Sequence, residues 1–339
     1  MLSKFLKIIL ILLIYQNPLY SKNNTLNKFN LHHLSNYFSG IVAYENRDNT
    51  DALKFFEASK FLIKKHNPYL ENYTYSLVLE GRVQQASNEI KRNLNEKNSN
   101  FFEAHLILAL DSLKKKNYEK SKYQLNQSKK FINNDRIALA IFETIKEYLY
   151  VFEENKLPAE KKNFGNFSFI NEVFQRCYLD DQNTTTYFET IVNQENRQDY
   201  SRYIFFYINY LIENDKPNQV KKITDNLDYL NSSLLISQGK KWILDKKLNE
   251  FKNIFSCRNS NDIVSEFFFL VANLYSSEGE YENSNFYLNI SHYLNPKFIF
   301  NLSLLAENYY MNGDYLNTLK VLKVFDKDDE FYYWFKLKK

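Results

Sequence analysis

Glycine and proline are scarce in this chain, with 6 glycines and 5 prolines among 339 residues. Sheet proteins need turn-forming residues at about every tenth position, and α/β folds need glycine in the tight loops between strands and helices. The shortage therefore argues against both of these fold classes. We predict a chain that is almost entirely α-helical.

Cysteine is scarcer still, because only Cys177 and Cys257 are present. Two cysteines are too few for a disulfide framework, and their spacing does not match a metal site. They could form one disulfide in an oxidising compartment if the fold brought them together. The sequence alone favours the alternative, which is two separate thiols on different helices.

An excess of charge of one sign is also absent. The chain has 44 basic and 40 acidic residues, a formal net charge of +4, and lysine is interleaved with aspartate and glutamate along its length. Nucleic-acid-binding proteins concentrate lysine and arginine on one face that contains few acidic residues. The charge pattern indicates a solvated helical surface and gives no support to nucleic-acid binding.

The common motifs for catalysis and metal binding are missing from the sequence. It has no GxSxG, Walker or GxGxxG motif, and its five histidines do not follow HExxH or Cys/His ligand spacing. The acidic clusters at 180–181 and 328–330 lack the alternate ligand positions and the central glycine of an EF-hand loop. We therefore predict no catalytic residue, no cofactor site and no metal site, and expect that the chain is not an enzyme.

The N-terminus has the order of a secretory signal: basic Lys4 and Lys7, an apolar run over residues 8–15, a break at Pro18 and the small Ser21. The apolar run is far shorter than the span of about 20 residues that a transmembrane helix needs. We predict that residues 1–21 form a signal peptide, that the chain is periplasmic or secreted, and that no permanent membrane span remains after cleavage. Because residues 19–21 match a cleavage site only weakly, an uncleaved signal that anchors the chain in the inner membrane is the alternative.

Aromatic residues are abundant, with 27 tyrosines and 29 phenylalanines that can fill an extended core. Some of them recur at a fixed period. The phrases at 278–284 and 311–318 place Gly279 and Gly313, and likewise Tyr281 and Tyr315, 34 residues apart. Earlier in the chain, Tyr118, Val83 and Asn49 occupy the corresponding position of the repeat. A period of this length is typical of repeat proteins.

Each of these phrases separates two amphipathic segments. Before the turn at 279, apolar residues recur at the spacing of one helix face, and small residues such as Ala272 and Ser284 stand where two helices would cross. The pattern predicts antiparallel helical hairpins joined at these turns. Between them, residues 135–156 are predicted to form one long helix, 158–165 a break, and the segments that begin near Pro217 and Leu248 two divergent second helices.

This period and pattern resemble the tetratricopeptide repeat. The resemblance is strongest over 264–325 and good over 35–131, although Asn49 and Val83 replace the turn aromatic and serine or threonine often replaces alanine. In the strongest region the matching residues are Phe268, Val271, Ala272, Tyr275, Tyr281, Ser284, Leu288, Ser291 and Pro296. The resemblance implies an all-α fold, a right-handed superhelix (α-solenoid) of antiparallel helix hairpins.

The predicted organisation after the signal peptide has three parts. Residues 22–131 are N-terminal repeats, 132–263 are divergent helical repeats, and 264–339 are C-terminal repeats whose last hairpin is incomplete. The next turn would fall beyond the last residue, so 331–339 would open a hairpin that does not close, and a shortened form of a longer array is one interpretation. This final stretch contains five consecutive aromatic residues, and is expected either to pack back on the last repeat or to bind a partner.

The resemblance implies a function without catalysis. In such arrays the first helices of the hairpins line a concave groove that holds a peptide or helix from another protein. We expect a protein-protein interaction scaffold of this type; the alternative is a self-associating structural solenoid or envelope-assembly component that associates through 331–339. A solenoid lytic transglycosylase is disfavoured, because no span remains for its lysozyme-like domain. The helical phase predicts these groove residues: Tyr75, Val78, Phe269, Asn273, Glu307 and Tyr310.

Overall fold

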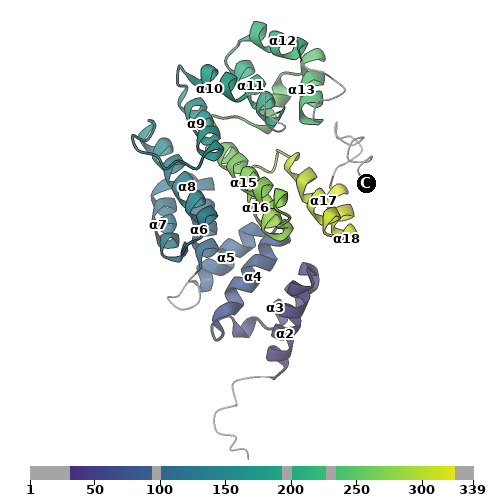
Figure 1. Ribbon diagram of the computed structural model, residues 1–339. Coiled ribbons are helices and arrows are strands. Elements are labelled where there is room, and N and C mark those ends of the chain that lie inside the picture. The colour runs from purple at the N-terminus through teal and green to yellow at the C-terminus, as the bar shows by residue number, and fades with distance from the viewer. Residues whose placement is uncertain (1–30, 94–100, 193–200, 227–233, 325–339) are drawn as a thin grey trace, which may run out of the picture. The chain divides into compact units, whose positions relative to one another are not determined.

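The computed structural model describes residues 31–93, 101–192, 201–226 and 234–324. These residues form seventeen α-helices and two short 3₁₀ helices, and contain no strand (Figure 1). The all-α prediction is therefore confirmed. None of the described helices combines the length and the apolar character that crossing a membrane requires. The predicted signal peptide and the aromatic stretch at 331–339 lie outside the described residues.

The chain forms two compact units that divide after His66. The first unit contains α2 (Leu31–Glu45), α3 (Asn49–Ala58) and the 3₁₀ helix η1 (Lys60–Leu62). The side chain of Asp48 caps α3 by accepting a hydrogen bond from the backbone N–H of Asp51 at 3.0 Å. A Cβ on Gly40 would lie 2.9 Å from the ring of Phe56, so glycine allows α2 and α3 to approach closely.

The second unit contains the remaining helices of the described chain. Their bounds are α4 (Asn67–Leu79), α5 (Val83–Asn93), α6 (Phe102–Lys114), α7 (Tyr118–Ser128), η2 (Lys129–Phe131), α8 (Arg136–Glu154), α9 (Asn166–Leu179), α10 (Thr184–Val192), α11 (Ser201–Glu213), α12 (Pro217–Asp225), α13 (Leu234–Leu244), α14 (Asn249–Ile254), α15 (Ser260–Ser277), α16 (Tyr281–Leu294), α17 (Asn301–Met311) and α18 (Tyr315–Leu322).

The helix boundaries agree closely with the repeat period. α5, α7, α16 and α18 begin at Val83, Tyr118, Tyr281 and Tyr315, the positions at which the sequence placed the turns. The predicted long helix is α8, and the divergent segment near Pro217 is α12, whose first residue is this proline. Proline suits the first position of a helix, because the N–H it lacks would have no partner there.

The tight turns between paired helices use a left-handed backbone. Gly81, Gly279 and Gly313 have φ angles of 74°, 78° and 77°, and Lys116 adopts φ 58° at the corresponding place before α7. Glycine adopts this region without the steric cost that a Cβ brings. The glycines that the period singled out therefore allow the chain to reverse between helices.

Small hydroxyl residues lie where paired helices cross, as the sequence predicted. The hydroxyl of Ser121 on α7 donates to the backbone carbonyl of Ala109 on α6 at 2.8 Å. The Thr318 hydroxyl on α18 lies 3.4 Å from the equivalent carbonyl of Ala306 on α17. A short side chain leaves room for close helix approach, and its hydroxyl finds an acceptor on the facing backbone.

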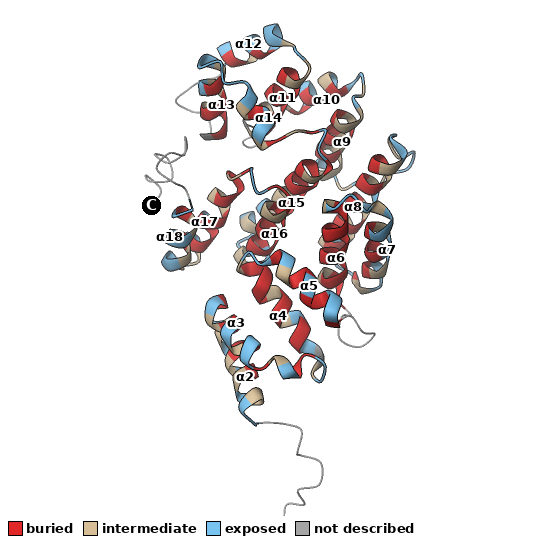
Figure 2. Ribbon diagram, turned by 180° about the vertical axis from the view of Figure 1, so that it is seen from behind, coloured by how far each residue is buried: buried red, intermediate tan, exposed pale blue. Residues whose placement is uncertain are grey.

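The C-terminal hairpin α15–α16 packs against helices that are distant in the sequence. α16 contacts α4 and α5, and α15 contacts α6, α8 and α9 (Figure 1). Asn289 of α16 donates to the Leu79 carbonyl at the end of α4 at 3.2 Å. Figure 2 shows that buried positions dominate α15 and α16, whereas α12 and α18 are largely exposed. In a simple repeat array each repeat contacts only its neighbours, so this unit has an additional long-range core.

A disulfide joins Cys177 at the end of α9 to Cys257 after α14, with 5.8 Å between their Cα atoms. Both cysteines are buried. Cys177 and Cys257 are therefore joined in the structure, whereas the sequence alone favoured two separate thiols. The bond closes a span of 80 residues that contains α10 to α14.

Loss of this disulfide should destabilise the second unit. Closing a loop of this length stabilises a fold by about 4 kcal/mol through the lost entropy of the unfolded chain, which corresponds to roughly 10 °C in melting temperature. We expect a drop of this order in the Cys177→Ala, Cys257→Ala variant, measured by thermal unfolding. The reductant dithiothreitol should lower the melting temperature of the wild type and leave that of the variant unchanged. Equal melting temperatures for the wild type and the variant would show that the disulfide does not stabilise the second unit.

Asp262 makes stability depend on pH. Its pKa is raised to about 7, mainly by burial and in addition by the charge of Glu213, while a hydrogen bond from the Ser256 N–H and the charge of Lys297 oppose the rise. An unfolded aspartate titrates near pH 4, so between about pH 4 and 7 the folded state binds the extra proton. This contribution is complete below about pH 4 and is lost as the pH rises toward 7. Its slope can reach about 1.4 kcal/mol per pH unit.

We therefore expect Asp262→Asn to flatten the fall in stability between pH 5 and pH 8. Urea unfolding at a series of pH values measures this slope as the free energy of unfolding. The control is Asp245→Asn, which changes an exposed carboxylate and should leave the slope as in the wild type. An unchanged slope in Asp262→Asn would show that another group carries the dependence.

Candidate functional site

Of the two predicted groove residues on α4, Val78 lies in the core of the second unit and Tyr75 is half-buried. The ring of Tyr75 on α4 packs against Phe286 of α16, with 4.8 Å between ring centroids. Val78, one turn further along α4, has no exposed surface. The face of α4 that was expected to receive another protein is covered here by α16 of the same chain.

A polar cluster fastens α16 to α5 and α6. The hydroxyl of Tyr293 on α16 donates to Asp111 of α6 at 2.8 Å. Lys91 and Lys115 also donate to this buried carboxylate. Burial alone would raise the pKa of Asp111, but the hydrogen bonds from Lys115, Lys91 and Tyr293 outweigh it and hold the pKa well below its usual range. The carboxylate is therefore charged, and with a further hydrogen bond from the Gln84 amide it holds four partners, from α5, the end of α6 and α16.

Phe269 of α15 is half-buried because Arg202 of α11 covers it. The guanidinium carbon of Arg202 lies 3.5 Å from the centroid of the Phe269 ring. The same guanidinium donates to both carboxylate oxygens of buried Glu266 at 2.6 Å, and to the Asn301 side chain of α17 at 2.7 Å. Phe269 thus belongs to a contact that joins three helices.

The remaining three predicted residues are at the surface. Asn273 lies on α15, and Glu307 and Tyr310 lie on α17, all with exposed side chains. The Tyr310 ring packs beside that of Tyr315, with 5.6 Å between centroids. Binding of another protein at the predicted groove residues stays a prediction. Asn273, Glu307 and Tyr310 are the three of the six whose side chains are exposed.

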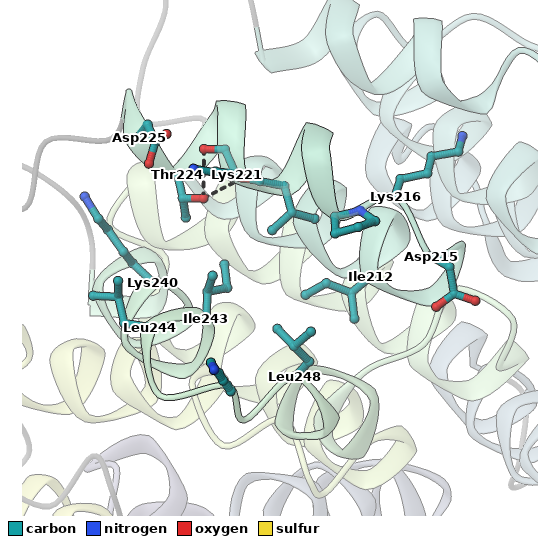
Figure 3. Close-up of a pocket in the computed structure, with 13 residues that line it drawn as sticks. Ile212, Asp215, Lys216, Lys221, Thr224, Asp225, Lys240, Ile243, Leu244 and Leu248 are labelled. Carbon is teal, nitrogen blue, oxygen red and sulfur yellow. Dashed lines mark hydrogen bonds between the residues drawn. The ribbon is translucent and has the colours of Figure 1, made fainter.

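A cavity of about 610 Å³ opens elsewhere, between α11, α12, α13 and the turn before α14 (Figure 3). Ile212, Ile243 and Leu248 project into it from three different segments, and Val220 and Pro217 of α12 complete an apolar wall. The full lining is Ile212, Asp215, Lys216, Pro217, Val220, Lys221, Thr224, Asp225, Lys240, Ile243, Leu244, Lys246 and Leu248. We call this space the α12–α13 cavity.

α14, which follows the cavity in the sequence, is a short helix. The second helices α5, α7 and α16 have 11, 11 and 14 residues, whereas α14 has 6. No residue of α14 lines the cavity; the last lining residue in the sequence is Leu248, the N-cap of α14. Leu244 and Leu248 expose apolar surface.

Lysine side chains dominate the charged rim of the cavity. Lys216, Lys221, Lys240 and Lys246 contribute four positive charges, against two negative charges from Asp215 and Asp225. The ammonium of Lys216 donates to Thr185 at 3.3 Å, which directs it toward α10, so three lysines and two aspartates remain around the opening. An apolar wall with an excess of positive charge around it favours an amphipathic ligand that carries carboxylates or other anions.

The lining offers little for acid-base or nucleophilic chemistry. It contains neither histidine, glutamate nor cysteine. Its one hydroxyl, on Thr224, donates to the backbone carbonyl of Val220 within α12. Among the residues that the structure describes, no three His, Cys, Asp or Glu side chains are placed to hold a metal ion. The geometry of the cavity suits binding.

The sequence pattern did not single out this cavity. The alternation of lysine with isoleucine and leucine in α12 and α13 was visible, but the same alternation marks any solvated amphipathic helix. The lining residues come from separate segments, and their convergence could be recognised only once these helices were placed.

Comparisons with known proteins give no family for the chain. No family model matches it, and a search of curated proteins found no match.

The contact between α16 and α6 can be tested at Tyr293. Tyr293→Phe keeps the ring and removes the hydrogen bond to Asp111, which should cost about 1–2 kcal/mol and speed amide hydrogen exchange in α16 by about tenfold. The matched control is Tyr123→Phe on α7, where the tyrosine is 61% exposed. Equal exchange in the two variants would mean that the Tyr293 hydroxyl does not hold α16 in place.

Proposed function

We propose that this chain is an exported, non-enzymatic scaffold that binds a segment of another protein in the α12–α13 cavity. The observation that carries the proposal is the apolar wall of that cavity with its excess of lysine at the rim. The helices α5, α7, α16 and α18, which begin at the period of the tetratricopeptide repeat, support an interaction protein of that type. A right-handed superhelix and membership of the tetratricopeptide class are part of this proposal.

The occupant that fits best is an amphipathic helix with acidic residues on its polar side. The cavity runs beside α12, whose 9 residues correspond to a length of about 13 Å. This length matches two to three turns of a bound helix, with apolar anchors at i, i+3 or i+4, and i+7. Its carboxylates would meet the lysine rim, which adds specificity and speeds association.

The disulfide supports the exported location. Disulfides form and persist in oxidising compartments such as the periplasm or the cell exterior, and Cys177 and Cys257 are paired. This agrees with the secretory pattern at the N-terminus. A periplasmic or secreted protein is therefore the proposal, with an inner-membrane protein anchored by an uncleaved signal as the alternative.

Leu244 provides a direct test of the binding site. Leu244→Asp places a negative charge in the apolar wall and should abolish capture of the partner from the cells' own envelope fraction. Leu316→Asp is the matched control, because this leucine lies on α18 and is 83% exposed; it should capture the partner as well as the wild type. Bound proteins are identified by mass spectrometry, and cross-links from Lys221 or Lys240 should map to an acidic amphipathic segment of the partner.

Other outcomes point elsewhere. Equal capture by Leu244→Asp and the wild type contradicts the cavity as the site. A partner that is lost only in a Tyr310→Ala variant places the contact on α17. If the envelope fraction yields only the chain itself, self-association replaces partner binding as the best explanation.

Self-association is a second candidate because of an exposed apolar surface on the last hairpin. The side chains of Leu316 and Val324 are 83% and 64% exposed, more than most apolar residues of a soluble protein. They belong to a group at the end of α17 and along α18: Tyr310, Met311, Tyr315, Leu316, Leu319 and Val324. Contiguous apolar surface of this kind often marks a protein interface.

A further inference from the structure

Three tyrosine rings and one glutamate gather where α16 packs against α4 and α15 packs against α6 (Figure 1). The ring of Phe286 lies 4.8 Å from that of Tyr75 on α4 and 5.3 Å from that of Tyr287 on α16. Tyr287 stacks in turn on Tyr275 of α15, with 5.6 Å between the ring centroids. The carboxylate of Glu103 on α6 acts on both Tyr75 and Tyr287. We call Tyr75, Glu103, Tyr275 and Tyr287 the tyrosine–glutamate cluster.

The tyrosine–glutamate cluster is partly open to solvent. Tyr75, Glu103 and Tyr275 are half-buried, whereas Tyr287 is buried. The three half-buried side chains come from three different helices, α4, α6 and α15. Tyr75 is also one of the residues that the helical phase assigned to a binding groove. A ligand can therefore contact aromatic rings and a carboxylate at this place without displacing a helix.

The charges around the cluster are negative. Burial raises the pKa of Glu103, and the carboxylates of Glu71 and Asp135 raise it further, while hydrogen bonding with Tyr75 opposes the rise. In the described part of the chain, the charged groups that act most strongly on the three tyrosines are acidic as well. A carboxylate that is partly removed from water is costly unless a cation compensates it. A cation from a ligand would supply this compensation.

The same chain shows which cation such a combination holds. The guanidinium of Arg202 lies 3.5 Å from the centroid of the Phe269 ring and pairs with Glu266 at 2.6 Å. One aromatic ring and one glutamate of α15 thus bind an arginine of the chain itself. Guanidinium groups stack on aromatic faces and pair with carboxylates through a planar fork of N–H donors. The tyrosine–glutamate cluster presents the same two kinds of group, with more rings.

We propose that the tyrosine–glutamate cluster binds an arginine side chain of another protein. The guanidinium stacks on the tyrosine rings and pairs with the carboxylate of Glu103. Half-buried groups on three helices contact the end of a side chain and leave the rest of the ligand in solvent, which suits an arginine that projects from a protein segment. The cluster shares no residue with the α12–α13 cavity and attracts the opposite charge, so the proposal does not rest on binding in that cavity.

A peptide-like arginine compound tests the proposal on the full chain. N-acetyl-arginine amide carries the guanidinium, and N-acetyl-citrulline amide has nearly the same shape without the charge. Binding is titrated by saturation-transfer difference NMR at pH 8, where the carboxylate is ionised. We expect the arginine compound to bind and the citrulline compound to bind about tenfold more weakly, because it can form neither the ion pair nor the cation–π contact.

Substitutions locate the bound arginine. Glu103→Gln keeps the size of the side chain and should weaken binding of the arginine compound about tenfold. Its matched control is Glu119→Gln, because Glu119 is likewise the second residue of a helix, α7, and is exposed; this variant should bind like the wild type. Tyr275→Leu keeps an apolar side chain without the ring and should weaken binding about fivefold. Thermal unfolding verifies that each variant is folded.

Four results would overturn the proposal. Equal binding of the arginine and citrulline compounds would mean that the charge is not recognised. Unchanged binding in Glu103→Gln would place the arginine elsewhere. An equal loss in Glu103→Gln and Glu119→Gln would reveal a general effect of acidic residues at helix N-termini. Tighter binding of free L-arginine than of the amide would assign the site to the amino acid in place of a protein.

Discussion

The arrangement of the second unit depends on the ion pair between Arg202 and Glu266. Glu266 is buried and accepts two hydrogen bonds from the guanidinium of Arg202, and Asn301 accepts a third. The ring of Phe269 stacks against the face of the guanidinium. Burying charge is unfavourable unless the partner geometry is very good, and loss of one partner leaves the other charge uncompensated. Because the three polar side chains come from α11, α15 and α17, this contact fixes the C-terminal hairpins to the middle of the chain, next to the segment that forms the cavity.

A consequence of this arrangement is that the chain covers much of its own expected binding face. α16 lies over α4 and α5, Tyr75 packs against it and Val78 is buried. The Asp111 cluster then secures α16 with charged hydrogen bonds, which are stronger than neutral ones. A concavity on the remaining surface is the α12–α13 cavity, which lies between α11, α12, α13 and the turn before α14.

The sequence predicted local structure far better than long-range packing. Turns near Gly279 and Gly313, and the helices that start at Tyr281 and Tyr315, follow from backbone conformation and helical period, which neighbouring residues determine. The contact of Tyr75 with Phe286 depends on a helix more than 200 positions away, and the pairing of Cys177 with Cys257 depends on how α9 meets the end of α14. The cavity escaped prediction for the same reason, because its lining comes together from α11, α12, α13 and the turn before α14 rather than from any residue motif.

The disulfide between Cys177 and Cys257 also has a mechanical meaning. The helices α10 to α14, with the cavity among them, lie inside the covalent ring that this bond closes. If a load pulls on the two ends of the chain, the force passes through the sulfur atoms and bypasses the residues within the ring. Those helices are therefore shielded from tension even while the flanking hairpins extend. A binding site inside such a ring can keep its shape in a protein that works under strain between two attached structures.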